Sequence, residues 1–234
     1  GVARDKVRVI TGDTDKTPYG GGTWASRGAG IGGEATWQAA RALRSQVLET
    51  AGVMLQSDPE TLEVADGWVV DRDGGGQRLG LDDLARTVYY RANELPHDHQ
   101  PELMATRHFR VKDYPFVFTN GVQASWLEVD IETGQVRILN FVLGHDSGTV
   151  INPMIVEGQV FGGIAHGVGN GLFEWMGYDE NAQPLTTNYA EYLLVSAPEM
   201  PPVTLVHHES PSPVNPLGVK GVGECGGVPT PSAI

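Results

Sequence analysis

The pattern of hydrophobic and polar positions predicts three helices. Over residues 34–56, apolar residues recur at helical spacing and form one stripe along the predicted helix. A shorter amphipathic helix is predicted over residues 81–91. A third helix is predicted over residues 154–175, because Pro153 occupies a position typical of the first helical turn.

Strands are predicted between these helices. Residues 6–11 alternate charged and apolar side chains, and residues 62–71 have the pattern of a hairpin with a turn at its centre. The clearest hairpin joins residues 121–130 to residues 135–143, and a last strand is predicted over residues 202–207. The mixture predicts an α+β fold in which mixed sheets pack against helices.

The 31 glycines of the chain cluster, and the first cluster is a loop over residues 20–33 that leads into the first long helix. Backbone N–H groups at such a helix start can bind an anion. Thr23, Ser26 and Arg27 add side-chain donors that suit an anionic cofactor. The loop matches neither a P-loop nor a dinucleotide-binding fingerprint, and a flexible surface loop is the alternative interpretation.

The helix predicted over residues 154–175 is rich in glycine, although each glycine costs a helix up to about 1 kcal/mol relative to alanine. We therefore expect another part of the structure, or a ligand, to lie close against it. Gln159, on the glycine-lined face, could bind a heterocycle through both of its amide atoms. Close packing of the helix on a sheet explains the glycines equally well.

The terminal stretch, residues 215–231, places Glu224 among glycines and prolines, with Lys220 and Cys225 nearby. Such a stiff loop can bring a carboxylate close to a ligand and exclude water, and desolvation raises the pKa of a carboxyl group towards the range useful for a base. Glu224 is therefore a candidate general base. The residues alone favour a plainer interpretation, a surface ion pair with Lys220, and predict Cys225 to be a small buried thiol.

Two histidine-containing patterns are not interpreted as sites. His97 and His99, and the pair His207-His208, have no carboxylate or cysteine at ligand spacing. Residues 144–148 superficially resemble a serine-hydrolase signature, but a catalytic triad draws its members from separate elements, so we predict a turn there.

Charge and composition narrow the classes of function. The formal net charge of −13 argues against nucleic-acid binding, which requires clustered Lys and Arg. No apolar run is long enough to span a membrane, and one cysteine excludes an internal disulfide framework.

Three longer runs carry a family resemblance. They are TGDTDKTPYGGGTWASRGAGIGG at residues 11–33, LEVDIETGQVRILNFVLGHDSGTVINPMIVEGQVFGGIAHGVGNGLFE at residues 127–174, and SPSPVNPLGVKGVGECGGVP at residues 210–229. Together they resemble the molybdenum-binding subunit of the xanthine dehydrogenase/aldehyde oxidase family, which includes aerobic carbon monoxide dehydrogenase. The resemblance covers nearly the whole chain.

The resemblance implies roles for individual residues. It identifies Glu224 as the base that removes a proton beside the molybdenum, and it implies no metal ligand from a side chain. Trp24 is bulky and indicates a small or flat substrate. The residues that would bind the cofactor are Gly22, Thr23, Trp24, Ala25, Ser26, Arg27, Gly28, Gln159, Lys220, Gly221, Val222 and Gly223.

The resemblance also implies cofactors and partners. The cofactor is molybdopterin with molybdenum, in the cytosine dinucleotide form common in bacterial members, and [2Fe-2S] clusters and FAD reside on partner subunits. The expected reaction is hydroxylation of an aldehyde or N-heterocycle with oxygen from water, in a cytoplasmic complex or one carried to the periplasm by a partner.

The family's molybdenum subunit is far longer than this chain, so a further molybdenum-subunit chain or segment is expected to complete the site. The whole chain is expected to be one cofactor-binding region, with subdomains dividing near residue 115 into 1–115 and 116–234. One alternative is a non-catalytic subunit that binds the cofactor or partner subunits. Others are a member resembling carbon monoxide dehydrogenase or hydroxybenzoyl-CoA reductase, and an unrelated phosphate-binding enzyme.

Overall fold

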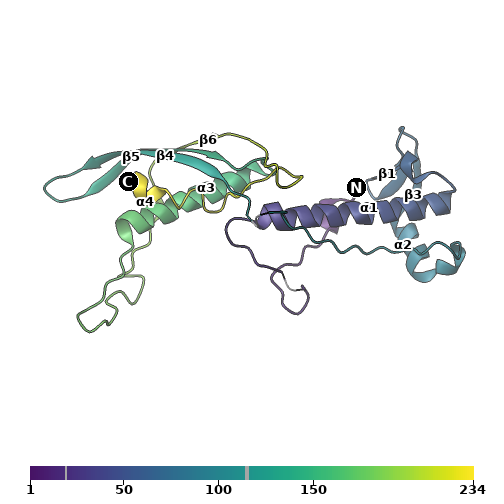
Figure 1. Ribbon diagram of the computed structural model, residues 1–234, viewed down its shortest axis with the longest axis horizontal. Helices are drawn as coiled ribbons and strands as arrows, with labels where there is room; N and C mark the ends of the chain where they lie inside the picture. Colours follow the sequence, from purple (N-terminus) through teal and green to yellow (C-terminus); the bar gives the residue numbers. More distant parts are fainter. Residues whose placement is uncertain (19, 114–115) are drawn as a thin grey trace. The chain divides into compact units, whose positions relative to one another are not determined.

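The computed structural model describes residues 1–18, 20–113 and 116–234. The chain folds into two compact units (Figure 1). The first unit contains residues 1–21 and 35–108, and the second contains residues 22–34 and 109–234. Residues 22–33 of the glycine loop therefore belong to the second unit, whereas the helix that follows belongs to the first from its second residue onward.

The first unit is built on helix α1 (Glu34–Leu55) and an antiparallel sheet in the order β1-β2-β3. The strands are β1 (Leu62–Ala65), β2 (Trp68–Asp71) and β3 (Gln77–Gly80), and helix α2 (Leu81–Tyr90) follows directly. The predicted helices and hairpin of this unit are confirmed. The apolar stripes of both helices meet the sheet in a core of Leu48, Ala51, Leu62, Val69, Leu84 and Val88.

The second unit contains a mixed sheet in the order β4-β5-β6 and the glycine-rich helix α3 (Pro153–Val168). Strands β4 (Asn120–Val129) and β5 (Val136–Asp146) are antiparallel, and β6 (Val203–His207) pairs in parallel with β5. Figure 1 shows α3 along one side of this sheet. The α+β prediction is confirmed, and the core consists of Phe141, Leu143, Val160, Ile164, Val168 and Cys225.

The terminal segment packs closely on α3 and ends in a short helix, α4 (Thr230–Ala233). A Cβ built on Gly163 would lie 2.8 Å from the Cα of Gly226, and one built on Gly167 would lie 2.4 Å from the Cβ of Thr230. Glycine at these positions is therefore required by contact with the terminal segment. This confirms the expectation that something lies close against the helix.

Two sequence predictions need correction. The strand predicted over residues 6–11 is wrong, because residues 7–11 contain no strand, and Val9 is 79% exposed. Alternating charged and apolar side chains do not make a strand by themselves, because a strand also needs a neighbouring strand to accept and donate its backbone hydrogen bonds. The third helix is shorter than predicted, since α3 ends at Val168 and gives way to a π-helical turn at Gly169–Phe173, where glycines weaken helical continuity.

Within the described part of the chain, no helix is both long and apolar enough to cross a membrane.

Candidate functional site

Three segments of the second unit that are far apart in sequence converge around Glu224. The hydroxyl of Ser26, in the glycine loop, donates a hydrogen bond to Oε2 of Glu224 over 2.8 Å. A Cβ built on Gly223 would lie 3.2 Å from Oγ of Ser26 and 3.6 Å from Oε1 of Gln159 on α3. The structure thus brings together Glu224, the candidate base, with the glycine loop and with Gln159, the residue expected to bind a heterocycle.

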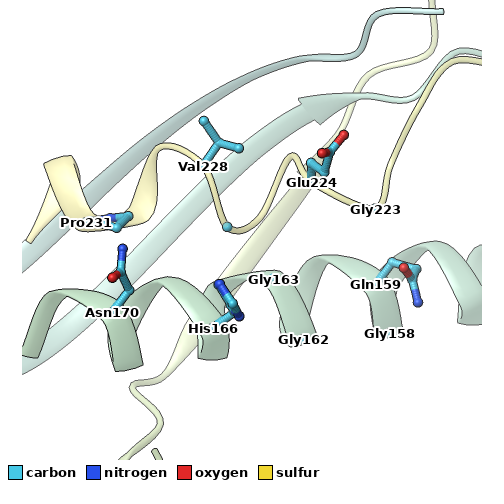
Figure 2. A pocket seen from close by; sticks show the side chains of 11 residues that line it. Gly158, Gln159, Gly162, Gly163, His166, Asn170, Gly223, Glu224, Val228 and Pro231 are labelled. Carbon is cyan, nitrogen blue, oxygen red and sulfur yellow. The ribbon is translucent and has the colours of Figure 1, made fainter. Parts of the chain in front are cut away.

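A groove of about 560 Å³ runs between α3 and the terminal segment. Gln159, His166 and Asn170 lie on the helix side of the groove, and Glu224 and Val228 lie on the terminal segment alongside (Figure 2). Glu224 and Gln159 are both exposed in this chain. The groove can therefore receive a ligand that contacts the helix and the carboxylate together.

His166 and Asn170 are groove residues that the sequence interpretation missed. His166 follows Gln159 by seven residues on α3, and Asn170 follows it by eleven, in the π-helical turn that continues the helix. That spacing was a usable signal, but it becomes informative only when the groove-facing side of the helix is known.

A second, smaller cavity of about 220 Å³ is also lined by Glu224. Its walls include Ala25, Ser26, Phe116 and Gly221. Glu224 therefore lines two cavities, one rich in glycine and the other partly aromatic.

The glycine loop has an unusual backbone at Ala25 and Ser26, with φ of 51° and 53°. Residues with a side chain seldom adopt this left-handed region, and such strained positions concentrate at ligand sites. The strained backbone lies beside the hydrogen bond from Ser26 to Glu224. We interpret it as the conformation that brings the Ser26 hydroxyl to the carboxylate.

The remaining loop residues contact one another. Nη2 of Arg27 donates to the carbonyl of Gly22 over 3.0 Å, and its guanidinium lies 4.1 Å from the centre of the Trp24 ring. A Cβ built on Gly28 would lie 3.3 Å from the methyl group of Thr23. The guanidinium of Arg27 therefore joins two parts of the loop, through its hydrogen bond to Gly22 and a cation–π contact with Trp24.

Lys220 does not pair with Glu224, so the surface ion pair considered from the sequence is wrong. Its ammonium lies 2.5 Å from Oδ2 of Asp146 and 2.7 Å from Oγ of Ser210. The side chains of Lys220 and Asp146 are only 12% and 11% exposed. The predicted turn at residues 144–148 is also wrong in part, because His145 and Asp146 are the buried last residues of β5.

The other predicted residues of the terminal loop divide between core and groove. Gly221 is buried and its N–H donates to the carbonyl of Val117 over 2.9 Å. Val222 packs against the core of the second unit, and Gly223 lines the groove. Glu34, which the sequence interpretation missed, is fully buried and accepts a hydrogen bond from the N–H of Leu217 over 3.2 Å.

Asp146 gives the second unit a specific acid sensitivity. Burial acts to raise the pKa of Asp146, but hydrogen bonds from Lys220, Ser210 and Gly148 outweigh it and hold the pKa well below its usual range. A carboxyl group whose pKa is lowered by folding contributes stability that is complete above its unfolded pKa, about 3.9, and is lost as the pH falls towards the folded value.

Asp146→Asn is therefore expected to lower the melting temperature at pH 7 and to reduce its further fall below about pH 4. Thermal unfolding from pH 7 to pH 2.5 measures both effects. Asp5→Asn, at an exposed carboxylate, is the control and should follow the wild-type curve. If the melting temperature of Asp146→Asn fell as steeply below about pH 4 as that of the wild type, the assignment would be contradicted.

Cys225 is the buried thiol expected from the sequence, with 7% of its surface exposed. Its Sγ–H donates to the carbonyl of Val222 over 3.2 Å. Burial raises the pKa of the Cys225 thiol, although nearby backbone hydrogen bonds oppose this effect. A neutral, buried thiol is a poor nucleophile.

We expect iodoacetamide at pH 7.5 to leave Cys225 unmodified in the folded protein and to alkylate it fully after unfolding in guanidinium. Mass spectrometry of the peptide that contains Cys225 measures the modification. Rapid alkylation of the folded protein would contradict the buried, neutral state.

No group of three or more His, Cys, Asp or Glu side chains that could hold a metal ion occurs among residues 1–18, 20–113 and 116–234.

A protein-family model, described as molybdopterin cofactor-binding domain, matches residues 1–201 of this chain. The nicotine 6-hydroxylase large subunit of Paenarthrobacter nicotinovorans is 34% identical over 234 residues, which are 100% of this chain and 28% of that protein. The carbon monoxide dehydrogenase large chain of Afipia carboxidovorans is 33% identical over 236 residues, which cover 98% of this chain and 28% of that protein.

Solved structures show the same likeness. The quinoline 2-oxidoreductase of Pseudomonas putida 86 superposes with a TM-score of 0.78 at 35% sequence identity, over 94% of this chain and 28% of that one. The carbon monoxide dehydrogenase of Oligotropha carboxidovorans superposes with a TM-score of 0.78 at 31% identity, over 94% of this chain and 27% of that one. The chain thus spans less than a third of the length of these relatives.

Proposed function

The chain belongs to the molybdopterin cofactor-binding domain family, and from this we propose that it forms part of the active site of a molybdenum hydroxylase, with Glu224 as the general base. The observation that carries the proposal is that Glu224 and Gln159 line one groove while Ser26 holds the Glu224 carboxylate by a hydrogen bond. A carboxylate held beside a cofactor groove is suited to accept the proton of the hydroxyl group whose oxygen is transferred to the substrate.

The residues of the groove fit a flat pterin. A Cβ built on Gly158 or Gly162 would meet nothing within 4 Å, whereas one on Gly163 would collide with the terminal segment. Contacts within the chain therefore explain Gly163 but not Gly158 and Gly162, which weaken the helix. A planar ligand lying on the helix backbone would account for both, with the Gln159 amide positioned to bind its heteroatoms.

The cofactor, when bound, supplies the redox chemistry and the oxygen-transferring centre, and this chain supplies binding, orientation and the proton acceptor. Ser26 donates to Oε2 of Glu224 and so restrains the carboxylate. Neither Asp146 nor Lys220 lines the groove, and the ammonium of Lys220 is bound by Asp146, so we assign the cofactor contact of this stretch to Gly223.

We propose an N-heterocycle as substrate, hydroxylated at a ring carbon with oxygen from water. The names of two relatives, nicotine 6-hydroxylase and quinoline 2-oxidoreductase, support this class over an aldehyde. Trp24, in the glycine loop that also carries Ser26, forms an edge-to-face pair with Phe116, and their ring centres are 5.2 Å apart. Such a pair favours a flat aromatic substrate.

The likeness to carbon monoxide dehydrogenase large chains supports the second candidate, oxidation of carbon monoxide. For either reaction we propose the cytosine dinucleotide form of molybdopterin, partner subunits that carry [2Fe-2S] clusters and FAD, and a cytoplasmic complex.

The test uses the full molybdenum subunit purified with its partner chains. Molybdenum is measured by elemental analysis, and nicotine, quinoline, benzaldehyde and carbon monoxide are assayed with a dye as electron acceptor in ¹⁸O-labelled water. Molybdenum in the complex and ¹⁸O in a hydroxylated heterocycle would support the proposal. A complex without molybdenum would contradict it, and molybdenum without turnover of any substrate would favour a non-catalytic binding subunit.

A further inference from the structure

We propose that Asp146 and Lys220 form a positioning pair that holds the loop of Glu224 in its reactive place, an inference that rests on the proposed role of Glu224 as base. Neither side chain lines the groove of Gln159 and Glu224. Their effect on the reaction would pass through the backbone of residues 220–224. This makes them positioning residues and not catalytic residues.

Asp146 collects donors from three separate segments. Its Oδ2 accepts hydrogen bonds from Nζ of Lys220 and from Oγ of Ser210. Its Oδ1 accepts from the N–H of Gly148 over 2.8 Å and from the N–H of Ser210 over 3.1 Å. One carboxylate therefore ties the end of β5 to the segment at Ser210 and to the terminal loop.

Two backbone hydrogen bonds fix the chain between this anchor and Glu224. The N–H of Lys220 donates to the carbonyl of Ser147 over 2.7 Å, and the N–H of Gly221 donates to the carbonyl of Val117 over 2.9 Å. Glu224 follows three residues later. The loop thus enters the groove from a fixed point at Lys220 and Gly221.

A second anchor holds the loop after Glu224. Nε2 of Gln123 on β4 donates to the carbonyls of Cys225 and Gly226, each over 3.1 Å, and Oγ1 of Thr230 donates to the carbonyl of Gly226 over 2.5 Å. Residues 222–224 therefore form a short span between two anchors. A change at the Asp146–Lys220 anchor is transmitted to Glu224, because the other end cannot move to compensate.

Stability alone is a weak reason for this ion pair. Removing two charges from water is costly, and a well-packed apolar pair of similar size often stabilises a protein as well or better. The pair offers instead a defined geometry, since the carboxylate of Asp146 meets four donors at once. A base must be placed precisely, because a displacement of about 1 Å can cost about 100-fold in rate.

The test is a double-mutant cycle in the full complex, with Lys220→Met, Asp146→Asn and the double variant. We expect each single variant to lower kcat per bound molybdenum 10- to 100-fold, with KM and molybdenum content within twofold of wild type. The double variant should be no worse than the poorer single variant, because both residues act as one unit. Lys220→Arg, which keeps the charge, should recover much of kcat.

Hydrogen–deuterium exchange supplies a readout that does not depend on turnover. Amides of residues 221–227 should exchange at least tenfold faster in Lys220→Met and Asp146→Asn. The control is another close ion pair, Asp71 and Arg78 in the first unit, whose Oδ1 and Nη1 atoms lie 2.7 Å apart and whose side chains are each 31% exposed. Asp71→Asn and Arg78→Met should leave exchange at residues 221–227 and kcat unchanged.

Two outcomes would overturn the inference. One is unchanged exchange at residues 221–227 in both single variants. The other is a loss of molybdenum with normal kcat per bound molybdenum, which would assign Lys220 to cofactor binding.

Failure of the proposed function would be recognised separately. If Glu224→Gln retained full activity, the proposed function would fail, and faster exchange in the Lys220 and Asp146 variants would then show an anchored loop with no bearing on a base. If Lys220→Met does not fold, Asp146→Asn and Lys220→Arg provide the same comparison.

Discussion

Replacement of Glu224 by glutamine is expected to lower kcat by about 10² to 10⁴-fold, the range that general base catalysis usually contributes. Glutamine has nearly the same shape as glutamate and can still accept a hydrogen bond from the Ser26 hydroxyl, so the loop should keep its conformation. An amide cannot accept the proton, however. Molybdenum content should therefore stay at the wild-type level while turnover is lost.

The measurement compares kcat per bound molybdenum in the full complex, with reduction of the metal followed by absorbance. Glu180→Gln is the matched control, because Glu180 is an exposed carboxylate of the same unit at a turn remote in sequence from the groove. The kcat of Ser26→Ala should lie between those of Glu224→Gln and Glu180→Gln, because this variant keeps the base but loses the hydrogen bond that restrains it. Wild-type turnover in Glu224→Gln would exclude Glu224 as the base.

Alanine at Gly163 and at the adjacent Gly162 should have opposite effects on stability. A Cβ at position 163 would lie 2.8 Å from the Cα of Gly226 and the backbone N of Gly227, which overpacks the contact between α3 and the terminal segment. We expect Gly163→Ala to cost about 1–3 kcal/mol of stability. At position 162 a Cβ meets nothing within 4 Å, so Gly162→Ala should stabilise the helix by up to about 1 kcal/mol.

The informative result concerns the cofactor. If a pterin lies on the open face of α3, the methyl group of Gly162→Ala should hinder it, so this more stable variant should bind less molybdenum. Thermal unfolding of the cofactor-free subunit and elemental analysis of the loaded complex measure the two quantities separately. Full molybdenum loading in Gly162→Ala would place the cofactor elsewhere.

Local signals in the sequence predicted much of the fold. The period of apolar residues located α1 and α2 well, because each buries one face against a neighbouring sheet. The β4–β5 hairpin followed from alternation around a tight turn. The prediction over residues 6–11 failed because alternation says nothing about whether a partner strand exists.

The candidate site was predicted unevenly. The motif resemblance selected Glu224, the glycine loop and Gln159, and the structure brings these together in one unit. It also selected Lys220, for which the sequence offered Glu224 as the nearest partner. The structure pairs it instead with Asp146, 74 residues earlier in the chain.

The sequence by itself therefore determined which segments form helices and hairpins and which residue types are available to bind and react. Only the tertiary structure decided how those residues are used. It separated the glycines of α3 into a packed row at Gly163 and Gly167 and an open pair at Gly158 and Gly162. The physical reason is that periodicity is a local property, whereas the partner of a buried charge and the neighbour of a glycine are set by how distant segments pack.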